Sequence, residues 1–169
     1  MSTSSEQTVS FDATGSAPGP AGALAADERA AAAAPELELD EFRLRGLLGQ
    51  GGMGAVYLAH DTVLDREVAL KLVHGRAGAR SHARFLVEAR AIARLEHPNV
   101  VRIHRAATSR DGRPYLVQEL LRGRTLDRLR RPLPPRRACE LALAVARGLA
   151  AAHEVGVLHR DVKPSNVML

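Results

Sequence analysis

Polar residues of several kinds crowd together near the end of the 169-residue sequence. The stretch LHRDVKPSNVML, residues 158–169, holds a histidine, an arginine, an aspartate, a lysine and an asparagine within eight positions. Asp161 can accept or orient a proton, Lys163 can neutralise a bound anion, and the amide oxygen of Asn166 can ligate a hard cation. This density of polar groups is typical of the floor of an active site.

Three glycines near residue 50 form a second region of interest. Gly49, Gly51 and Gly54 stand in a G-x-G-x-x-G frame, in which missing side chains let backbone N–H groups approach phosphate oxygens. A glycine-rich hairpin turn with no ligand explains the frame equally well. In a dinucleotide-binding unit a helix follows the glycines, whereas AVYLAHD (55–61) alternates like a strand. If the glycines bind phosphate, the pattern therefore predicts a hairpin lid above it.

A lysine inside an apolar strand calls for an anionic partner. Lys71 lies among apolar neighbours in REVALKLV (66–73), and an isolated buried ammonium group is costly. Glu88, in the middle of the next helical segment, is the candidate partner. The alternative is a solvated Glu88 that pairs with Arg84 four positions earlier on the helix.

Hydrophobic periodicity indicates the elements that position these residues. Alternating patterns joined by short connections predict five antiparallel strands, at 42–50, 55–61, 66–73, 100–108 and 114–120.

A period of 3.6 residues predicts two helices. The first spans 81–97, with Ser81 as its N-cap and Pro98 just past its end. The second spans 136–153, and Cys139 is expected on its apolar side as a core residue. The sequence thus predicts an α+β fold, with a five-stranded antiparallel sheet and one inserted helix, followed by the beginning of a helical part.

Composition divides the chain into two unlike parts. Residues 1–40 hold seven acids and one base, so the net charge of +5 leaves +11 for residues 41–169. The first part is rich in Ala, Ser, Pro and Gly, and we expect a disordered acidic leader. The arginines of the second part are scattered without interleaved aromatics, which argues against nucleic acid as the partner and suits a polyanionic small molecule.

Cysteine content and hydropathy bear on location. Cys139 is the sole cysteine, which fits a reducing compartment. No apolar run approaches the roughly 18 residues that a transmembrane helix needs, and the N-terminus lacks the pattern of a secretory signal. We therefore expect a cytoplasmic protein without a membrane segment in this chain.

From residue 42 onward the chain resembles the N-terminal lobe of a eukaryotic-type (Hanks-type) protein kinase, most closely the bacterial serine/threonine branch. GQGGMGAV (49–56) fits G-x-G-x-x-G-x-V, VALK (68–71) fits V-A-x-K of the third strand, and HRDVKPSN (159–166) fits the catalytic-loop pattern H-R-D-x-x-x-x-N. The resemblance implies ATP- and Mg²⁺-dependent transfer of the γ-phosphate to Ser or Thr hydroxyls of protein substrates. It also implies three parts: a leader at 1–40, an N-lobe at 41–121 and an incomplete C-lobe at 122–169.

The resemblance assigns catalytic roles to Asp161, Lys163, Lys71 and Glu88, and a metal-binding role to Asn166. Asp161 would orient the substrate hydroxyl, and Lys163 would neutralise the γ-phosphate. Lys71, paired with Glu88, would contact the α- and β-phosphates, and Asn166 would hold magnesium. Lysine two positions after the aspartate is what serine/threonine kinases carry.

The remaining implied contacts belong to the nucleotide. Val56 and Ala69 would sandwich the adenine, and the backbone of Glu119 and Leu121 would meet its edge. Gln118 falls where the family places its gatekeeper, at which methionine or threonine is expected. The phosphate-covering loop comprises Gly49, Gln50, Gly51, Gly52, Met53 and Gly54.

Kinases of this family continue after the catalytic-loop asparagine into a D-F-G motif, whose aspartate holds the main magnesium ion. This sequence stops three residues past Asn166, so we expect a fragment cut off inside its active site. Two hypotheses remain open at this point. In the first, the chain belongs to a catalytic kinase, which the presence of Gly49, Lys71, Asp161 and Asn166 favours. In the second, it is a non-catalytic nucleotide-binding or interaction module, which the missing D-F-G favours.

Overall fold

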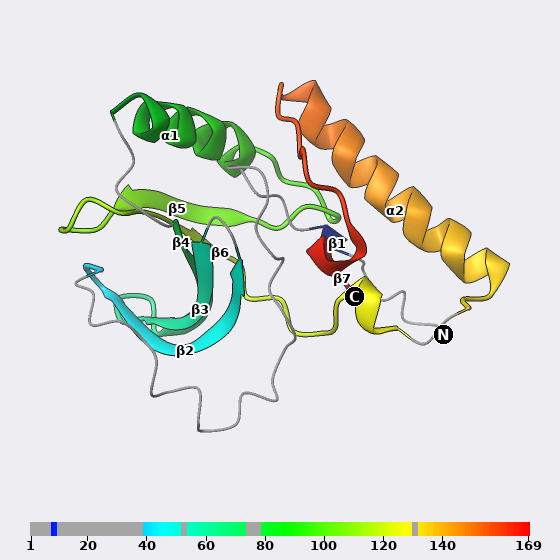
Figure 1. Ribbon diagram of the computed structural model, residues 1–169, viewed down its shortest axis with the longest axis horizontal. Coiled ribbons are helices and arrows are strands. Elements are labelled where there is room, and N and C mark those ends of the chain that lie inside the picture. The colour runs from blue at the N-terminus through cyan, green and yellow to red at the C-terminus, as the bar shows by residue number, and fades with distance from the viewer. Residues whose placement is uncertain (1–7, 10–38, 52–53, 74–78, 130–131) are drawn as a thin grey trace.

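The computed structural model describes residues 8–9, 39–51, 54–73, 79–129 and 132–169. The disorder expected for the leader therefore falls largely outside the described residues, and the proposed part boundaries stay predictions. One antiparallel sheet of five strands dominates the structure, in the order β2-β3-β4-β6-β5 (Figure 1). Its strands are β2 (Phe42–Gly51), β3 (Gly54–Asp61), β4 (Arg66–Val73), β5 (Ile103–Thr108) and β6 (Pro114–Gln118). The predicted five-stranded sheet is thus confirmed.

Alternating apolar residues bury one face of this sheet. Strand residues two apart point to the same face, which explains why Val68, Leu70 and Leu72 of β4 pack together. Leu39, just before β2, also lies in this cluster with 1% of its surface exposed. The cluster is completed by Phe42, Ala55, Tyr57, Ala59, Tyr115 and Val117.

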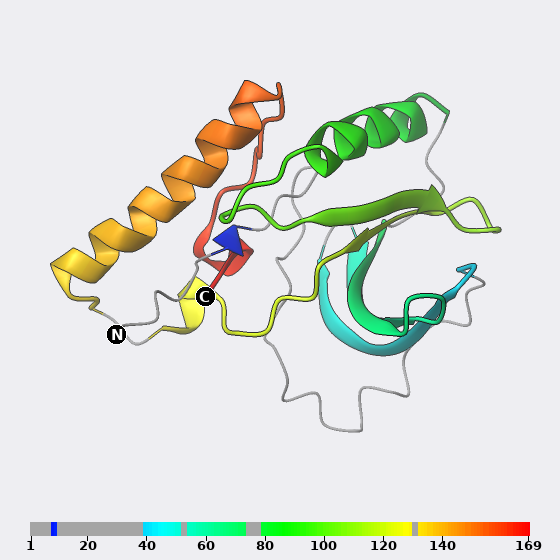
Figure 2. The ribbon, with the colours of Figure 1, turned by 180° about the vertical axis from the view of Figure 1, so that it is seen from behind.

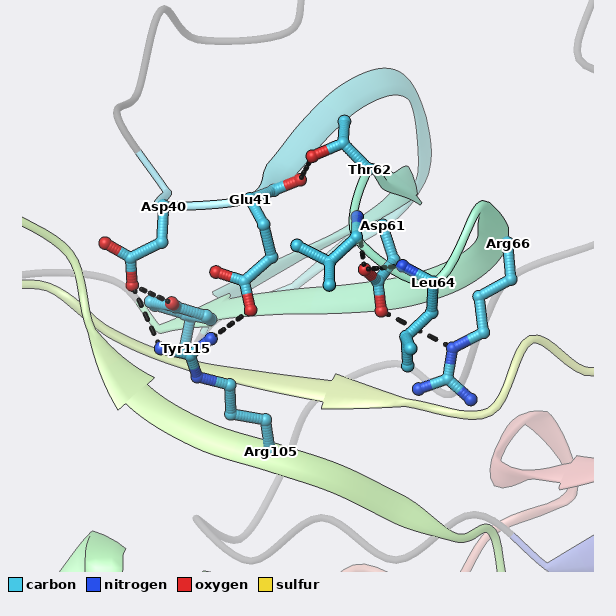
Figure 3. Close-up of polar contacts among 9 residues, drawn as sticks. Asp40, Glu41, Asp61, Thr62, Leu64, Arg66, Arg105 and Tyr115 are labelled. Atoms are coloured by element: carbon cyan, nitrogen blue, oxygen red, sulfur yellow. Dashed lines mark hydrogen bonds and ion pairs between the residues drawn. The ribbon is translucent and has the colours of Figure 1, made fainter.

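Charged groups hold the start of β2 against this apolar face (Figure 3). Arg105 of β5 binds the carboxylates of Asp40, at 3.1 Å, and Glu41. The Tyr115 hydroxyl donates to Asp40 at 3.3 Å, and burial raises the pKa of Tyr115 to about 12. Tyr115 therefore stays protonated as a donor, and these contacts fix where the sheet begins.

Asp61 organises the turn between β3 and β4 (Figure 3). Its carboxylate accepts hydrogen bonds from the backbone N–H groups of Val63, at 3.2 Å, and Leu64, at 3.0 Å. Arg66 adds an ion pair at 3.4 Å. The turn is thereby closed by a buried side chain.

Helix α1 (Ala79–Ala93) lies along one face of the sheet beside β5 (Figure 1). Phe85, Ala89 and Ile92, spaced for one helical face, bury against the sheet. The predicted end at residue 97 was wrong, because bonds from Arg94 to Ala91 and from Leu95 to Ile92 tighten and close the last turn. The helix already begins at Ala79, so Ser81 is its third residue, and the prediction of Ser81 as the N-cap was wrong.

The next strand also begins later than predicted. Val100 and Val101 are buried but belong to the connection, and β5 starts at Ile103. Two consecutive apolar residues look like part of a strand in the sequence, whether they join a sheet by backbone hydrogen bonds or only pack their side chains in the core. Here the Asn99 N–H bonds to the Nδ1 atom of His97, which shapes a loop instead of a strand.

Helix α2 (Pro135–Glu154) starts with a proline at its first turn and ends before Gly156, whose φ of 77° favours glycine. It buries the stripe Leu141, Gly148 and Ala152. A Cβ atom at Gly148 would lie 2.7 Å from the Asn99 carbonyl oxygen, so the helix packs directly on the loop before β5. Cys139 is exposed, and its prediction as a core residue was wrong.

A second sheet of two short strands was not predicted. Strand β1 (Thr8–Val9) pairs antiparallel with β7 (Val167–Met168), and the two lie side by side in Figures 1 and 2. Two residues are too few to leave a periodic signal in a sequence. Within the described ranges, no helix has both the length and the apolar character to cross a membrane.

Candidate active site

The glycine-rich segment forms the tip of the β2–β3 hairpin. Gly49 stands opposite Val56, and Gly51 opposite Gly54, while Gly52 and Met53 lie outside the described residues. Shifts of register between residues 44 and 46 and between 47 and 49 bend β2. The predicted hairpin, with a strand after the glycines, is thus observed.

Close packing of β3 against β4 explains why one residue of the G-x-G-x-x-G pattern is glycine. A Cβ atom at Gly54 would lie 2.3 Å from the Leu72 carbonyl oxygen of β4. Real Cβ atoms do not approach a backbone oxygen this closely, so any side chain here would push β3 away from β4. Gly54 is therefore required by the sheet itself, whatever lies above the loop.

Strand register brings Val56, Ala69 and Lys71 to one face of the sheet. Lys71 stands opposite Val56 on one side and Leu116 on the other, and Ala69 stands opposite Gln118. Directly opposed residues of antiparallel strands point to the same face. Lys71 is buried, with 4% of its surface exposed, so its charge is held inside the fold at this face.

Glu88 lies on the helix predicted to carry it, half-buried on α1. Its Oε1 atom is 3.9 Å from the Nη2 atom of Arg160 in the catalytic loop. This contact was not predicted, because no local pattern connects two residues so far apart in sequence. The pairing of Glu88 with Lys71 stays a prediction.

The segment after β6 presents backbone groups beside this face. The Glu119 N–H donates to the Arg102 carbonyl at 2.9 Å, so Glu119 can offer a ligand its carbonyl oxygen but not its N–H. Leu121 is half-buried two residues later. Arg122 forms an ion pair of 2.7 Å with Glu67 of β4, a contact that the sequence did not reveal.

The catalytic-loop residues gather around Asp161. The Asp161 N–H donates to the carbonyl of the buried His159 at 2.8 Å. The Asn166 amide donates through Nδ2 to the Asp161 carbonyl at 2.8 Å and to its Oδ2 atom at 3.2 Å. Arg160 has a φ of 60°, an uncommon conformation for a residue with a side chain, and it concentrates strain at this loop.

Lys163 sets the charge of this cluster. Its Nζ atom lies 2.7 Å from Oδ2 of Asp161. The hydrogen bond from Lys163 lowers the pKa of Asp161, burial opposes this effect, and the Asn166 amide reinforces it. Asp161 is therefore a carboxylate at neutral pH and presents acceptor atoms only.

The donor atoms of this loop suit magnesium. Mg²⁺ prefers oxygen ligands and is usually bound by one or two protein side chains together with water and phosphates. Because Asn166 donates through Nδ2, its Oδ1 atom is the one suited to a cation, and it stands beside the Asp161 carboxylate. Within the described ranges, no three His, Cys, Asp or Glu residues gather as metal ligands.

The end of the chain is bonded to the segment that follows β6. Leu169 and Arg124 exchange two backbone hydrogen bonds, at 3.0 and 3.2 Å. A Cβ atom at Gly123 would lie 1.9 Å from the Leu169 carbonyl oxygen, so only glycine permits this approach. The catalytic loop is thus fixed against the same segment that carries Glu119 and Leu121.

Comparisons with known proteins agree with this arrangement. The sequence pattern of the family described as "Protein kinase domain" matches residues 42–169. Among curated relatives, the serine/threonine-protein kinase PksC of Streptomyces coelicolor is 40% identical over 140 residues, and PknL of Mycobacterium tuberculosis is 42% identical over 134. Each alignment covers 76% of this chain, but 25% of PksC and 33% of PknL, so the chain spans a third or less of these relatives.

A solved structure shows the same fold. The kinase domain of Mycobacterium tuberculosis PknI superposes with a TM-score of 0.69 and 31% identity, over 80% of this chain and 58% of that one. The family match covers the sheet, α1, α2 and the catalytic loop together. The chain therefore belongs to the protein kinase family.

Proposed function

We propose that the whole protein is an ATP- and Mg²⁺-dependent serine/threonine kinase that transfers the γ-phosphate of ATP to hydroxyl groups of protein substrates. The arrangement around Asp161 is the observation that carries this proposal. Lys163 and Asn166 both contact its Oδ2 atom, which places a proton acceptor, a cation and an amide ligand within one loop. The relatives named as serine/threonine-protein kinases support the choice of acceptor.

The nucleotide lies on the face of the sheet that carries Lys71. Val56 and Ala69 enclose the base, and the carbonyl of Glu119 and the backbone of Leu121 meet its edge. The buried ammonium group of Lys71 neutralises the α- and β-phosphates, and Glu88 orients Lys71. The loop from Gly49 to Gly54 covers the phosphates.

Phosphoryl transfer depends mainly on alignment and charge. Asp161 accepts a hydrogen bond from the substrate hydroxyl and aims it at the γ-phosphate. Lys163 has three N–H donors, so it can bind Asp161 and the γ-phosphate at once. Asn166 would hold Mg²⁺, which supplies positive charge against the phosphates when bound.

The cellular setting follows from this chemistry. ATP and Mg²⁺ are abundant in the cytoplasm, and a lone exposed cysteine suits a reducing compartment, so we place the protein there. Its partners are ATP and proteins with Ser or Thr acceptors. Nucleic acid is not among them.

Nucleotide binding is tested by calorimetric titration of the 169-residue polypeptide with ATP and Mg²⁺. We expect weak binding that Lys71→Met weakens further, because the substitution removes the buried cation. Arg110→Met removes one positive charge from the exposed β5–β6 turn and is the matched control. Equal affinities of wild type and Lys71→Met would refute the role given to Lys71.

The transfer step is tested with radiolabelled ATP and a basic protein substrate. The whole protein should label Ser or Thr, and Asp161→Asn should abolish the label. The 169-residue polypeptide alone should give no detectable turnover, because Asn166 is the one magnesium ligand that the family pattern assigns within it. Turnover by this polypeptide that Asp161→Asn abolishes would show that these residues suffice.

A further inference from the structure

Gln118, the last residue of β6, is a buried amide in an apolar setting. Only 3% of its surface is exposed. In the part of the chain that the structure describes, its side chain has no hydrogen-bond partner. An amide carries two N–H donors and an acceptor oxygen, so its burial without partners costs free energy that the fold does not recover.

The neighbours of Gln118 explain why the protein leaves its amide unsatisfied. Ala69 of β4 and Ile103 of β5 stand directly opposite it, and neither side chain can form a hydrogen bond. Leu116 precedes it on the same face. Buried polar groups without a partner in the protein mark places where a ligand or an ordered water completes the hydrogen bonding.

The position of Gln118 selects a ligand group. The residue shares its face with Ala69 and Lys71 and comes directly before Glu119 in the chain. If the nucleotide site proposed above is correct, the base lies against Ala69 with its edge at Glu119. The amide of Gln118 then faces a substituent on this edge of the base, namely the substituent nearest to β6.

We infer that Gln118 reads the base, and that its amide oxygen accepts a hydrogen bond from the exocyclic amino group at C6 of adenine. That amino group has two N–H bonds. One meets the Glu119 carbonyl, since the Glu119 N–H is already bonded to Arg102, and the other meets Gln118. The inference rests on the proposed function and adds a side chain that selects the base.

The affinities for two nucleotides distinguish this hydrogen bond from a general effect of side-chain packing. ATP carries the 6-amino group, and purine riboside 5′-triphosphate carries hydrogen at that position. We expect Gln118→Met to weaken ATP binding roughly three- to tenfold, the range of a neutral hydrogen bond, and to leave the binding of the analogue unchanged. Leu116→Met alters a buried residue on the same face without touching an amide, and it should change both affinities by the same small factor.

Stability of the unliganded polypeptide is a second readout. Because Gln118 is unsatisfied without ligand, Gln118→Met and Gln118→Leu should raise the unfolding temperature. A fall would show that the amide is bonded within the unliganded protein, through ordered water, and would overturn the inference. Equal shifts for ATP and the analogue would overturn it as well, while the proposed nucleotide site would stand. If wild type binds neither nucleotide, the proposed site fails, and the base-reading role fails with it.

Discussion

Lys163 is the neighbour that does most to lower the pKa of Asp161, and its effect can be measured. Lys163→Met removes the hydrogen bond that does most to lower the pKa of Asp161, so that pKa should rise. Titration of the Asp161 carboxyl carbon by NMR reports the change. Arg110→Met, a distant charge removal, should leave the pKa in place, and an unchanged value in Lys163→Met would mean that the ion pair does not form in solution.

A second prediction for a single residue concerns Asp61 and the pH dependence of the stability that it contributes. Burial acts to raise its pKa, but hydrogen bonds from Leu64, Val63 and Arg66 outweigh burial and lower the pKa. A lowered folded pKa stabilises the protein above the unfolded value of about 3.9, and this contribution is lost as the pH falls through the folded pKa. Asp61→Asn should therefore cost roughly 1 to 3 kcal/mol at pH 7, and the cost should fall as the pH is lowered to 3.

Urea unfolding at the two pH values measures this difference. Asp65→Asn is the matched control, since the Asp65 side chain is exposed in the same turn, apart from its ion pair with His60. A penalty for Asp61→Asn that is the same at both pH values would show that the ionised carboxylate is not what closes the turn.

The contact between α2 and the loop before β5 reverses an ordinary preference. Replacing a glycine inside a helix by alanine normally gains about 1 kcal/mol. At Gly148 the added methyl group would meet the Asn99 carbonyl, and overpacking of this kind costs roughly 1 to 3 kcal/mol. We expect Gly148→Ala to lower the free energy of unfolding by about 1 kcal/mol, measured by chemical denaturation.

A propensity control separates the two effects. Ala150 is exposed on the same helix, so Ala150→Gly measures helix propensity alone and should lose about 1 kcal/mol. If Gly148→Ala stabilises the protein by the same amount, the helix stands farther from Asn99 than the structure shows.

Elements with a long periodic signal could be predicted from the sequence, and their ends could not. The pattern of REVALKLV predicted β4 with its observed bounds, and residues 68–72 of this strand are buried on both faces of the sheet. The end of α1 depends on hydrogen bonds from Arg94 and Leu95, and the sequence pattern continues past them. Cys139 was misplaced because an apolar residue on a helix can lie beside the buried stripe without belonging to it.

In the candidate active site, too, some features could be predicted from the sequence and others could not. Motif spacing located Asp161, Lys163 and Asn166, since a short loop keeps near neighbours in sequence near in space. The contact of Glu88 with Arg160, and the bond that occupies the Glu119 N–H, join separate elements. Such contacts depend on how α1 and β5 pack on the sheet, which no local pattern encodes.

At the scale of the whole molecule, one apolar cluster joins the sheet to the helical part. Ala152 and Val157, at the end of α2 and just beyond it, pack with Phe85, Ile92 and Leu116. An open apolar groove of about 610 Å³ borders α2 along residues 138–149, and its lining includes Leu133, Leu141 and Val145. Before Val145, no residue of the helix belongs to the shared cluster. The two halves of this helix therefore differ in how well they are supported.

Hydrogen exchange followed by mass spectrometry should reveal this difference. Backbone amides at 148–154 should exchange as slowly as those of β5, and amides at 138–143 should exchange faster, because no residue of 138–143 belongs to the shared cluster. Val157→Ala should speed exchange in β5 and in 148–154 together. Uniform exchange along α2 would contradict a shared cluster that reaches only its second half.

The exposed thiol of Cys139 gives the 169-residue chain a single site for thiol labelling. The chain has one cysteine, and its place on α2 lies outside the stripe formed by Leu141, Gly148 and Ala152. A maleimide dye or a nitroxide spin label will therefore attach at one known position in the 169-residue chain, without engineered substitutions. Since Ala138, the residue before Cys139, lines the groove, a molecule that enters the groove should restrict the rotation of the label.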